Sequence, residues 1–162
     1  YHGPSHMIEY FRDPEQTAEL YTADGFSKSG DLGIMDADGY VRVTGRVKDI
    51  VIRGGLNISS REVEDLLSSH DAVRAVAVVG MPDPRLGERS CAFIVLADDV
   101  ELTLSDVSAF LHEHKVAVQK HPERLEIVEA LPMTAMGKVR KNVLRDHIAA
   151  RIRMEAEISI ES

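Results

Sequence analysis

The stretch from Gly45 to Ile58 constrains the fold of this chain more than any other segment. Its 14 residues hold three cations, one acid, three glycines and the apolar run Ile50-Val51-Ile52. An apolar β-branched run directly after a charge run indicates a strand at the point where the chain enters a core. We therefore expect a junction between two bodies at residues 47 and 48, where few residues absorb large changes in backbone angle.

Residues 1–47 are rich in turns and in short extended segments. Asp13-Pro14-Glu15 is typical of a helix start, with Asp at the N-cap, Pro at N1 and an acid in the first turn. Short strands are expected over residues 26–28, 32–35 and 40–44, separated by glycine-containing turns. Because three short strands and one helix cannot bury a core of their own, this β-rich segment needs a partner surface.

Residues 48–155 alternate between apolar strands and amphipathic helices, in the order β-α-β-β-α-β-α. This order predicts an α+β fold, in which helices cover a small mixed sheet in two layers. No packing pattern follows Glu155, so residues 156–162 are expected to form a tail. The predicted elements are strands at 50–52, 73–79, 90–96 and 123–128, and helices that start at a Ser59–Glu62 capping box, at Thr103–Asp106 and shortly after Lys138.

Composition and charge exclude several classes of function. The chain is 44% apolar and 28% charged, as is usual for a globular protein. A net charge of −8 disfavours a general nucleic-acid or anionic-membrane partner. No apolar stretch approaches the roughly 20 residues of a membrane span, and no signal peptide is visible, so we expect a cytoplasmic protein. The single cysteine, Cys91, lies in an apolar strand and is expected to be a buried hydrophobe.

Two motifs at or before the junction combine charge with glycine. Asp31 stands between Gly30 and Gly33, where it is either a turn residue or a carboxylate that accepts hydrogen bonds from vicinal hydroxyls such as those of a ribose. Arg46 and Lys48 precede the apolar strand. A charge run of this kind is most often a solvated edge, although its place at the junction also suits a hinge. Local sequence leaves these alternatives open.

Two further motifs place glycine near cations. Gly54-Gly55 allows either a tight turn or the close approach of backbone to a ligand, and it lacks the spacing of a Walker or dinucleotide-binding loop. Lys138 follows a glycine before the last helix and is otherwise an ordinary surface lysine. Arg140-Lys141 lies near the predicted helix N-terminus, where cations oppose the helix dipole unless an anion arrives. The histidines show neither zinc spacing nor a catalytic triad, so no metal site is predicted.

Taken in order, these motifs resemble those of the acyl-adenylate-forming ligase superfamily. This superfamily includes acyl-CoA synthetases, the adenylation domains of peptide synthetases and beetle luciferases. Residues 29–33 are similar to its ribose-binding TGD element, residues 45–64 to its hinge element and residues 131–139 to its PxTxxGK element. Residues 85–93 and 122–126 look most like cyclohexanecarboxylate or medium-chain acyl-CoA ligases.

The resemblance implies a division of the chain into domains. Residues 1–47 would be the β-rich end of the N-terminal adenylating domain, and residues 48–155 the small, mobile C-terminal domain. The family's phosphate loop and acyl pocket lie in the N-terminal domain, which would therefore be the partner of this segment. The chain by itself is accordingly expected to be inactive.

The resemblance also implies an activity, that of an AMP-forming acid–thiol ligase. Such an enzyme converts a small carboxylic acid, Mg-ATP and CoA into acyl-CoA, AMP and pyrophosphate by way of an acyl-AMP. The resemblance makes Lys138 the catalytic residue of adenylation, Asp31 and Arg46 nucleotide contacts, Lys48 the hinge and Gly54-Gly55 part of the CoA channel. Two alternatives stay open: an acyl-AMP ligase that loads a carrier protein, and a non-catalytic, free-standing interaction domain.

Overall fold

The computed structural model of the chain describes residue 3 and residues 5–160. Residues 1, 2, 4, 161 and 162, which fall in the predicted end segments, lie outside the described part. The chain divides into two compact units, Tyr1–Lys48 and Asp49–Ser162. None of the helices in the described part combines the length and the apolar character that a membrane span requires.

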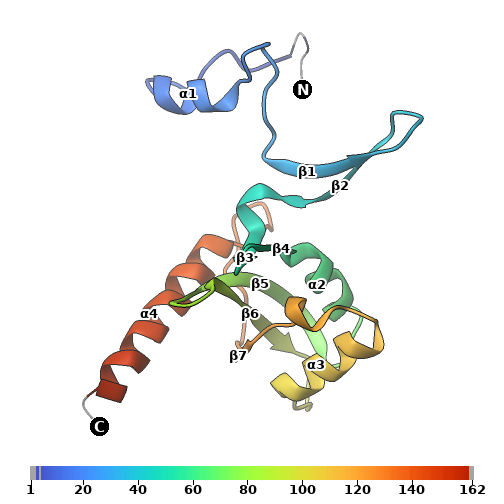
Figure 1. The fold of residues 1–162 in the computed structure, drawn as a ribbon, viewed down its shortest axis with the longest axis vertical. Helices are drawn as coiled ribbons and strands as arrows, with labels where there is room; N and C mark the ends of the chain where they lie inside the picture. Colours follow the sequence, from blue (N-terminus) through green and yellow to red (C-terminus); the bar gives the residue numbers. More distant parts are fainter. Residues whose placement is uncertain (1–2, 4, 161–162) are drawn as a thin grey trace. The chain divides into compact units, whose positions relative to one another are not determined.

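The first unit consists of one short helix and one hairpin (Figure 1). Its elements are α1 (Pro14–Leu20), β1 (Asp31–Met35), β2 (Val41–Arg46) and the 3-10 turn η1 (Val47–Asp49), which continues into the second unit. The side chain of Asp13 accepts a hydrogen bond from the backbone N–H of Gln16 at 2.9 Å, which confirms the predicted helix start. The predicted strand at 26–28 is wrong: only an isolated bridge between Tyr21 and Ser27 forms there.

The second unit is built on a five-stranded mixed sheet (Figure 1). The strands are β3 (Ile50–Arg53), β4 (Leu56–Ser59), β5 (Val73–Asp83), β6 (Gly87–Leu96) and β7 (Arg124–Ile127), and the path is β4-β3-β6-β5. Strand β7 pairs with β6 in parallel, whereas the other pairs are antiparallel. The helices are α2 (Ser60–Leu67), α3 (Leu104–Glu113), the 3-10 turn η2 (Val118–Lys120) and α4 (Lys141–Ile160).

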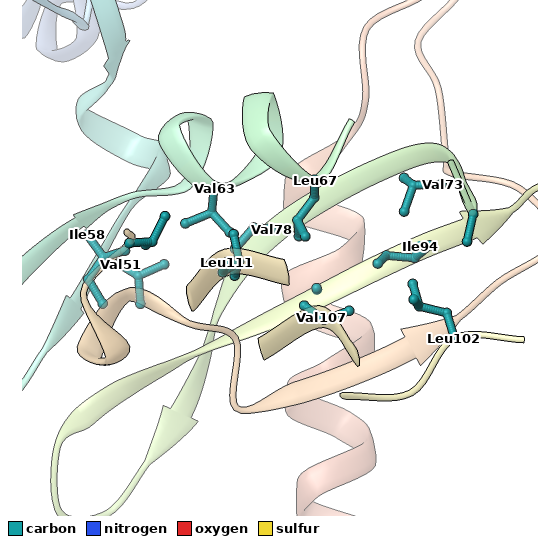
Figure 2. Close-up of a cluster of buried hydrophobic side chains, with 13 residues drawn as sticks. Val51, Ile58, Val63, Leu67, Val73, Val78, Ile94, Leu102, Val107 and Leu111 are labelled. Atoms are coloured by element: carbon teal, nitrogen blue, oxygen red, sulfur yellow. The ribbon is translucent and has the colours of Figure 1, made fainter. Parts of the chain in front are cut away.

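Helices cover both faces of this sheet. Val78 and Ile94 belong to a core cluster with side chains of α2 and α3 (Figure 2). Their chain neighbours Val79 on β5 and Phe93 on β6 belong to a second cluster, which includes side chains of α4. Successive side chains of a strand point to opposite faces, so both faces of these strands are buried. The α+β class with a mixed sheet is confirmed, and the predicted two layers become three.

Several predicted boundaries differ because tertiary pairing extends or redirects the local elements. Strand β5 was expected to end at residue 79 but continues to Asp83, since it stays paired with β6. Strand β4 was not predicted; it forms because the glycine pair folds residues 56–59 back onto β3. Helix α4 continues to Ile160, so the predicted tail from residue 156 is helical as far as it is described.

The two predicted helix caps of the second unit have different outcomes. Thr103 and Asp106 form a reciprocal capping box at the start of α3, as expected. Ser59 is the N-cap of α2, but its side chain makes no capping hydrogen bond. The expected partner, Glu62, instead accepts hydrogen bonds from Lys120 Nζ at 2.7 and 2.8 Å. A long-range ion pair has therefore replaced the predicted local contact.

Candidate functional site

Asp31 and Arg46 face each other across the hairpin of the first unit. They are paired residues in the register of β1 and β2, and Arg46 Nε lies 3.0 Å from Asp31 Oδ1. The Asp31 side chain is 28% exposed and the Arg46 side chain 59% exposed. Both groups are therefore accessible, and together they offer a carboxylate acceptor beside a guanidinium donor. Such a pair can hydrogen-bond a polyol hydroxyl and contact an anion at the same time.

The glycine pair forms the two-residue turn of the β3–β4 hairpin. Gly54 and Gly55 have φ values of +57° and +86°, so both central residues are in the region that glycine adopts without steric cost. A Cβ on Gly54 would lie 3.1 Å from Leu86 Cδ2, whereas a Cβ on Gly55 would meet nothing within 4 Å. Gly55 therefore presents bare backbone to open space.

Three contacts hold this turn against the rest of the second unit. The N–H of Gly54 donates to the carbonyl of Leu86 at 2.8 Å, and Arg53 NH2 lies 2.9 Å from Glu123 Oε1. Glu88 Oε2 accepts a hydrogen bond from the N–H of Ile52 at 2.8 Å. Glu88 was not among the predicted site residues, because a single acid on a strand has the same sequence pattern as a solvated residue. These contacts hold the turn itself and the end of β3 that leads into it.

Lys138 is presented by a small hydrogen-bonded loop that precedes α4. Residues Met133 and Val139 form an isolated bridge, and the N–H of Thr134 donates to the carbonyl of Lys138 at 2.7 Å. The N–H of Lys138 in turn donates to Thr134 Oγ1 at 3.1 Å. Gly137 has a φ of +76°, which lets the chain turn at this point. The loop is ordered by its own backbone, while the Lys138 residue at its surface is exposed.

The cations at the start of α4 are neutralised by acids of the same chain. Lys141 Nζ lies 2.7 Å from Glu64 Oε1 and 3.9 Å from Asp49 Oδ2, and Arg145 NH2 lies 2.7 Å from Asp49 Oδ1. The sequence predicted that cations here would await an external anion, and for Lys141 the anions are internal. Burial raises the pKa of Glu64, although the Lys141 ammonium opposes that shift.

The remaining predicted residues are placed as follows. Lys48 lies in η1 and is exposed, at the end of the first unit. Cys91 is buried, and burial raises the pKa of its thiol to about 12, in agreement with a structural role. Among the described residues, no group of three His, Cys, Asp or Glu side chains could hold a metal ion.

Comparison with known proteins gives a consistent group of relatives. Residues 62–138 match the family model described as the AMP-binding enzyme C-terminal domain. The chain is 47% identical over 160 residues to the medium-chain fatty-acid–CoA ligase of Escherichia coli K12. The aligned region is 98% of this chain and 28% of that enzyme. The chain is also 42% identical over 150 residues to the 2,3-dihydroxybenzoate-AMP ligase of Bacillus subtilis 168, and this aligned region is 93% of the chain and 28% of that enzyme.

A solved structure has the same fold. ATP-bound MatB from Rhodopseudomonas palustris aligns with a TM-score of 0.84 and 36% identity, covering 91% of this chain and 29% of that one. The chain thus spans about 28% of the length of the two curated relatives named above.

Proposed function

We propose that this chain acts within an AMP-forming acyl-CoA synthetase. The reason is that the chain belongs to the acyl-adenylate-forming ligase superfamily and contains its C-terminal domain. In this proposal residues 1–47 are the end of the N-terminal adenylating domain, and residues 48–155 are the mobile C-terminal domain. The observation that carries the proposal is that one compact unit presents both an exposed lysine on an ordered loop and a bare glycine turn. These two features suit two different chemical steps.

The first step is the adenylation of a carboxylic acid. A carboxylate oxygen attacks the α-phosphorus of ATP, and pyrophosphate leaves. Lys138 would place its ammonium between the carboxylate and the α-phosphate and stabilise the negative charge that builds there. Asp31 would accept hydrogen bonds from the ribose hydroxyls, while Arg46 holds Asp31 and contacts the nucleotide. Mg²⁺ would arrive with ATP, and we assign it no ligand in this chain.

The second step is the formation of the thioester. The thiol of CoA attacks the acyl carbon, and AMP leaves with the bonding electron pair. Gly55 has no atom within 4 Å of its missing Cβ, so its backbone would leave room for the thin pantetheine arm. In this proposal, rotation about Lys48 withdraws Lys138 and brings Gly54-Gly55 to the acyl-AMP, so that one domain serves both steps with different faces.

The proposal is tested with Lys138→Ala in the full-length enzyme. Adenylation, measured as ATP–pyrophosphate exchange, is expected to fall by about 10²–10³-fold, as is typical when one charge-stabilising group is removed. Thioester formation from supplied acyl-AMP is expected to continue at the original rate. The matched control is Lys115→Asn, which removes an exposed lysine whose φ of +60° asparagine tolerates. An equal loss of both steps would contradict the role of Lys138.

The acid and the acceptor are part of the proposal. The identity with the Escherichia coli enzyme supports a medium-chain fatty acid and CoA. The identity with the Bacillus subtilis AMP ligase supports a second candidate, transfer of the acyl group to a carrier protein. Thioester yield with CoA, compared with yield on a phosphopantetheinyl carrier, separates the two. The 162-residue chain alone is expected to catalyse no ATP–pyrophosphate exchange; measurable exchange would argue against dependence on a separate N-terminal domain.

A further inference from the structure

Four charged side chains from three parts of the second unit meet at the start of α4. Asp49 follows the junction, Glu64 lies on α2, and Lys141 and Arg145 lie on the first turns of α4. Lys141 contacts both acids, at 2.7 and 3.9 Å, and Arg145 contacts Asp49 at 2.7 Å. Two acids and two bases make the group neutral. Its side chains are only 16 to 31% exposed, so the attraction between them is weakly screened. We call this group the four-charge cluster.

The four-charge cluster is anchored in the core at both of its acids. Glu64 Oε1 accepts a hydrogen bond from the N–H of the buried residue Val78 at 2.6 Å, which attaches the cluster to β5. The carbonyl of Asp49 accepts a hydrogen bond from the hydroxyl of Ser60, which is itself buried, at 2.6 Å. The first residue after Lys48 is therefore tied to α2 by its backbone and to α4 by its side chain.

The loop that carries Lys138 ends at this cluster. Lys138 precedes Lys141 by three positions, and the N–H of Arg140 donates to the carbonyl of Pro132 at 2.7 Å, which closes the base of the loop. The hydrogen bonds of Lys138 that involve its backbone stay within the loop. The base of the loop is therefore attached to the start of α4, which the cluster contacts, and to the core against which Leu131 and Val139 pack.

We propose that the four-charge cluster positions Lys138. The cluster joins Asp49, the residue after the proposed hinge at Lys48, to the base of the loop that carries Lys138, so that the two move as one body. The part of this inference that concerns catalysis rests on the proposed function. Asp49, Glu64, Lys141 and Arg145 do not touch substrate in this account. They act through the position of Lys138, because a shift of about 1 Å in a catalytic group can cost orders of magnitude in rate.

The first test uses the 162-residue chain and needs no activity. In Glu64→Gln, amide hydrogen exchange at Thr134 and Arg140 is expected to be at least about tenfold faster than in the parent chain, since these N–H groups close the loop. The matched control is Asp65→Asn, which removes an acid from an exposed ion pair on the same helix and should leave the loop unchanged. Unchanged exchange in a folded Glu64→Gln chain would overturn the proposal.

A second variant keeps the test decisive if Glu64→Gln unfolds the chain. The double change Glu64→Gln with Lys141→Met removes both charges of the Glu64–Lys141 pair, and Asp49 keeps Arg145 as its partner, so no buried charge is left unpaired. It should fold, and its loop amides should still exchange faster than those of the parent chain, because the link from α4 to α2 is missing. Parent-like exchange in this variant would also overturn the proposal.

The second test uses the full-length enzyme. Asp49→Asn is expected to lower the kcat of adenylation about tenfold while the KM for ATP changes less than about twofold, because the loop is misplaced but the nucleotide contacts remain. Thioester formation from supplied acyl-AMP should be unaffected. Parent-like adenylation in Asp49→Asn would overturn the positioning role and leave the proposed function intact. If the parent enzyme itself shows no adenylation, the proposed function fails, and the exchange experiment still decides whether the cluster holds the loop.

Discussion

Substitution of Gly80 tests whether the Glu88 carboxylate holds the Gly54-Gly55 turn in place. Gly80 lies on β5, opposite Ser90 of β6. A Cβ at Gly80 would lie 2.8 Å from Glu88 Oε1 and 2.9 Å from Glu88 Cδ, which is closer than such atoms approach. Glu88 is the residue that accepts the hydrogen bond from Ile52, two positions before Gly54. Gly80→Ala should therefore push the carboxylate aside and break the contact with Ile52, although residue 80 lies on neither strand of the hairpin.

The size of the effect follows from two opposing terms. Loss of this exposed hydrogen bond to a charged acceptor lowers the free energy of unfolding by about 1.5 kcal/mol, the lower end of the range for such bonds. Replacement of glycine by alanine within a strand raises it by about 0.5–1 kcal/mol, because the unfolded chain has less freedom to lose. Gly80→Ala should thus destabilise the parent chain by about 0.5–1 kcal/mol. In a Glu88→Ala background no hydrogen bond remains to be lost, and the same change should stabilise by about 0.5–1 kcal/mol.

The assay is a double-mutant cycle with urea unfolding of four chains. Circular dichroism is the suitable probe because the sequence contains no tryptophan. The expected coupling between positions 80 and 88 is about 1.5 kcal/mol, with a reversal of sign between backgrounds. A coupling below about 0.5 kcal/mol would contradict this prediction, since independent sites add to within that error. It would mean that the Glu88 carboxylate does not lie over Gly80.

Three further predictions concern single positions. Gly55→Leu should cost about 1–2 kcal/mol of stability through backbone strain alone, measured by urea unfolding, because its φ is +86° and no atom lies near the new Cβ; in the full-length enzyme it should slow thioester formation and spare adenylation. Arg124 lowers the pKa of Glu155 to about 2, below its ordinary value of 4.5. This pair should therefore stabilise the fold above about pH 4.5 and lose its effect toward pH 2, so thermal melts of Glu155→Gln and the parent should differ at pH 7 and converge at pH 2. Cys91 should not react with a thiol reagent at pH 8 until the chain is unfolded, given its burial and a pKa of about 12; rapid labelling of the folded chain would contradict the packing of β6.

Features that depend on a few neighbouring residues could be predicted from the sequence alone. Asp13 and Thr103 were recognised as helix caps because a cap is made by residues three positions apart. The helix expected after Ser59 also forms, and Val63 and Leu67 are buried on one of its faces, as the amphipathic pattern of a helix requires. The motifs also appeared in the order of a known family, which was enough to identify it before any fold was known.

Tertiary structure decided which distant charges meet. Ser59 and Glu62 have the spacing of a capping box, yet Glu62 pairs with Lys120, 58 positions away. Glu64 and Lys141, which each resemble a solvated surface charge in the sequence, meet only because α2 and the start of α4 approach each other.

The junction where the sequence analysis began shows the same division. Its charges, glycines and apolar run determined a break in the chain and a strand after it. The pairing of Arg46 with Asp31 and of Asp49 with Arg145 was decided by the folded chain. The physical reason is distance: caps, turns and periodicity depend on covalent neighbours, whereas an ion pair depends on where separate elements pack.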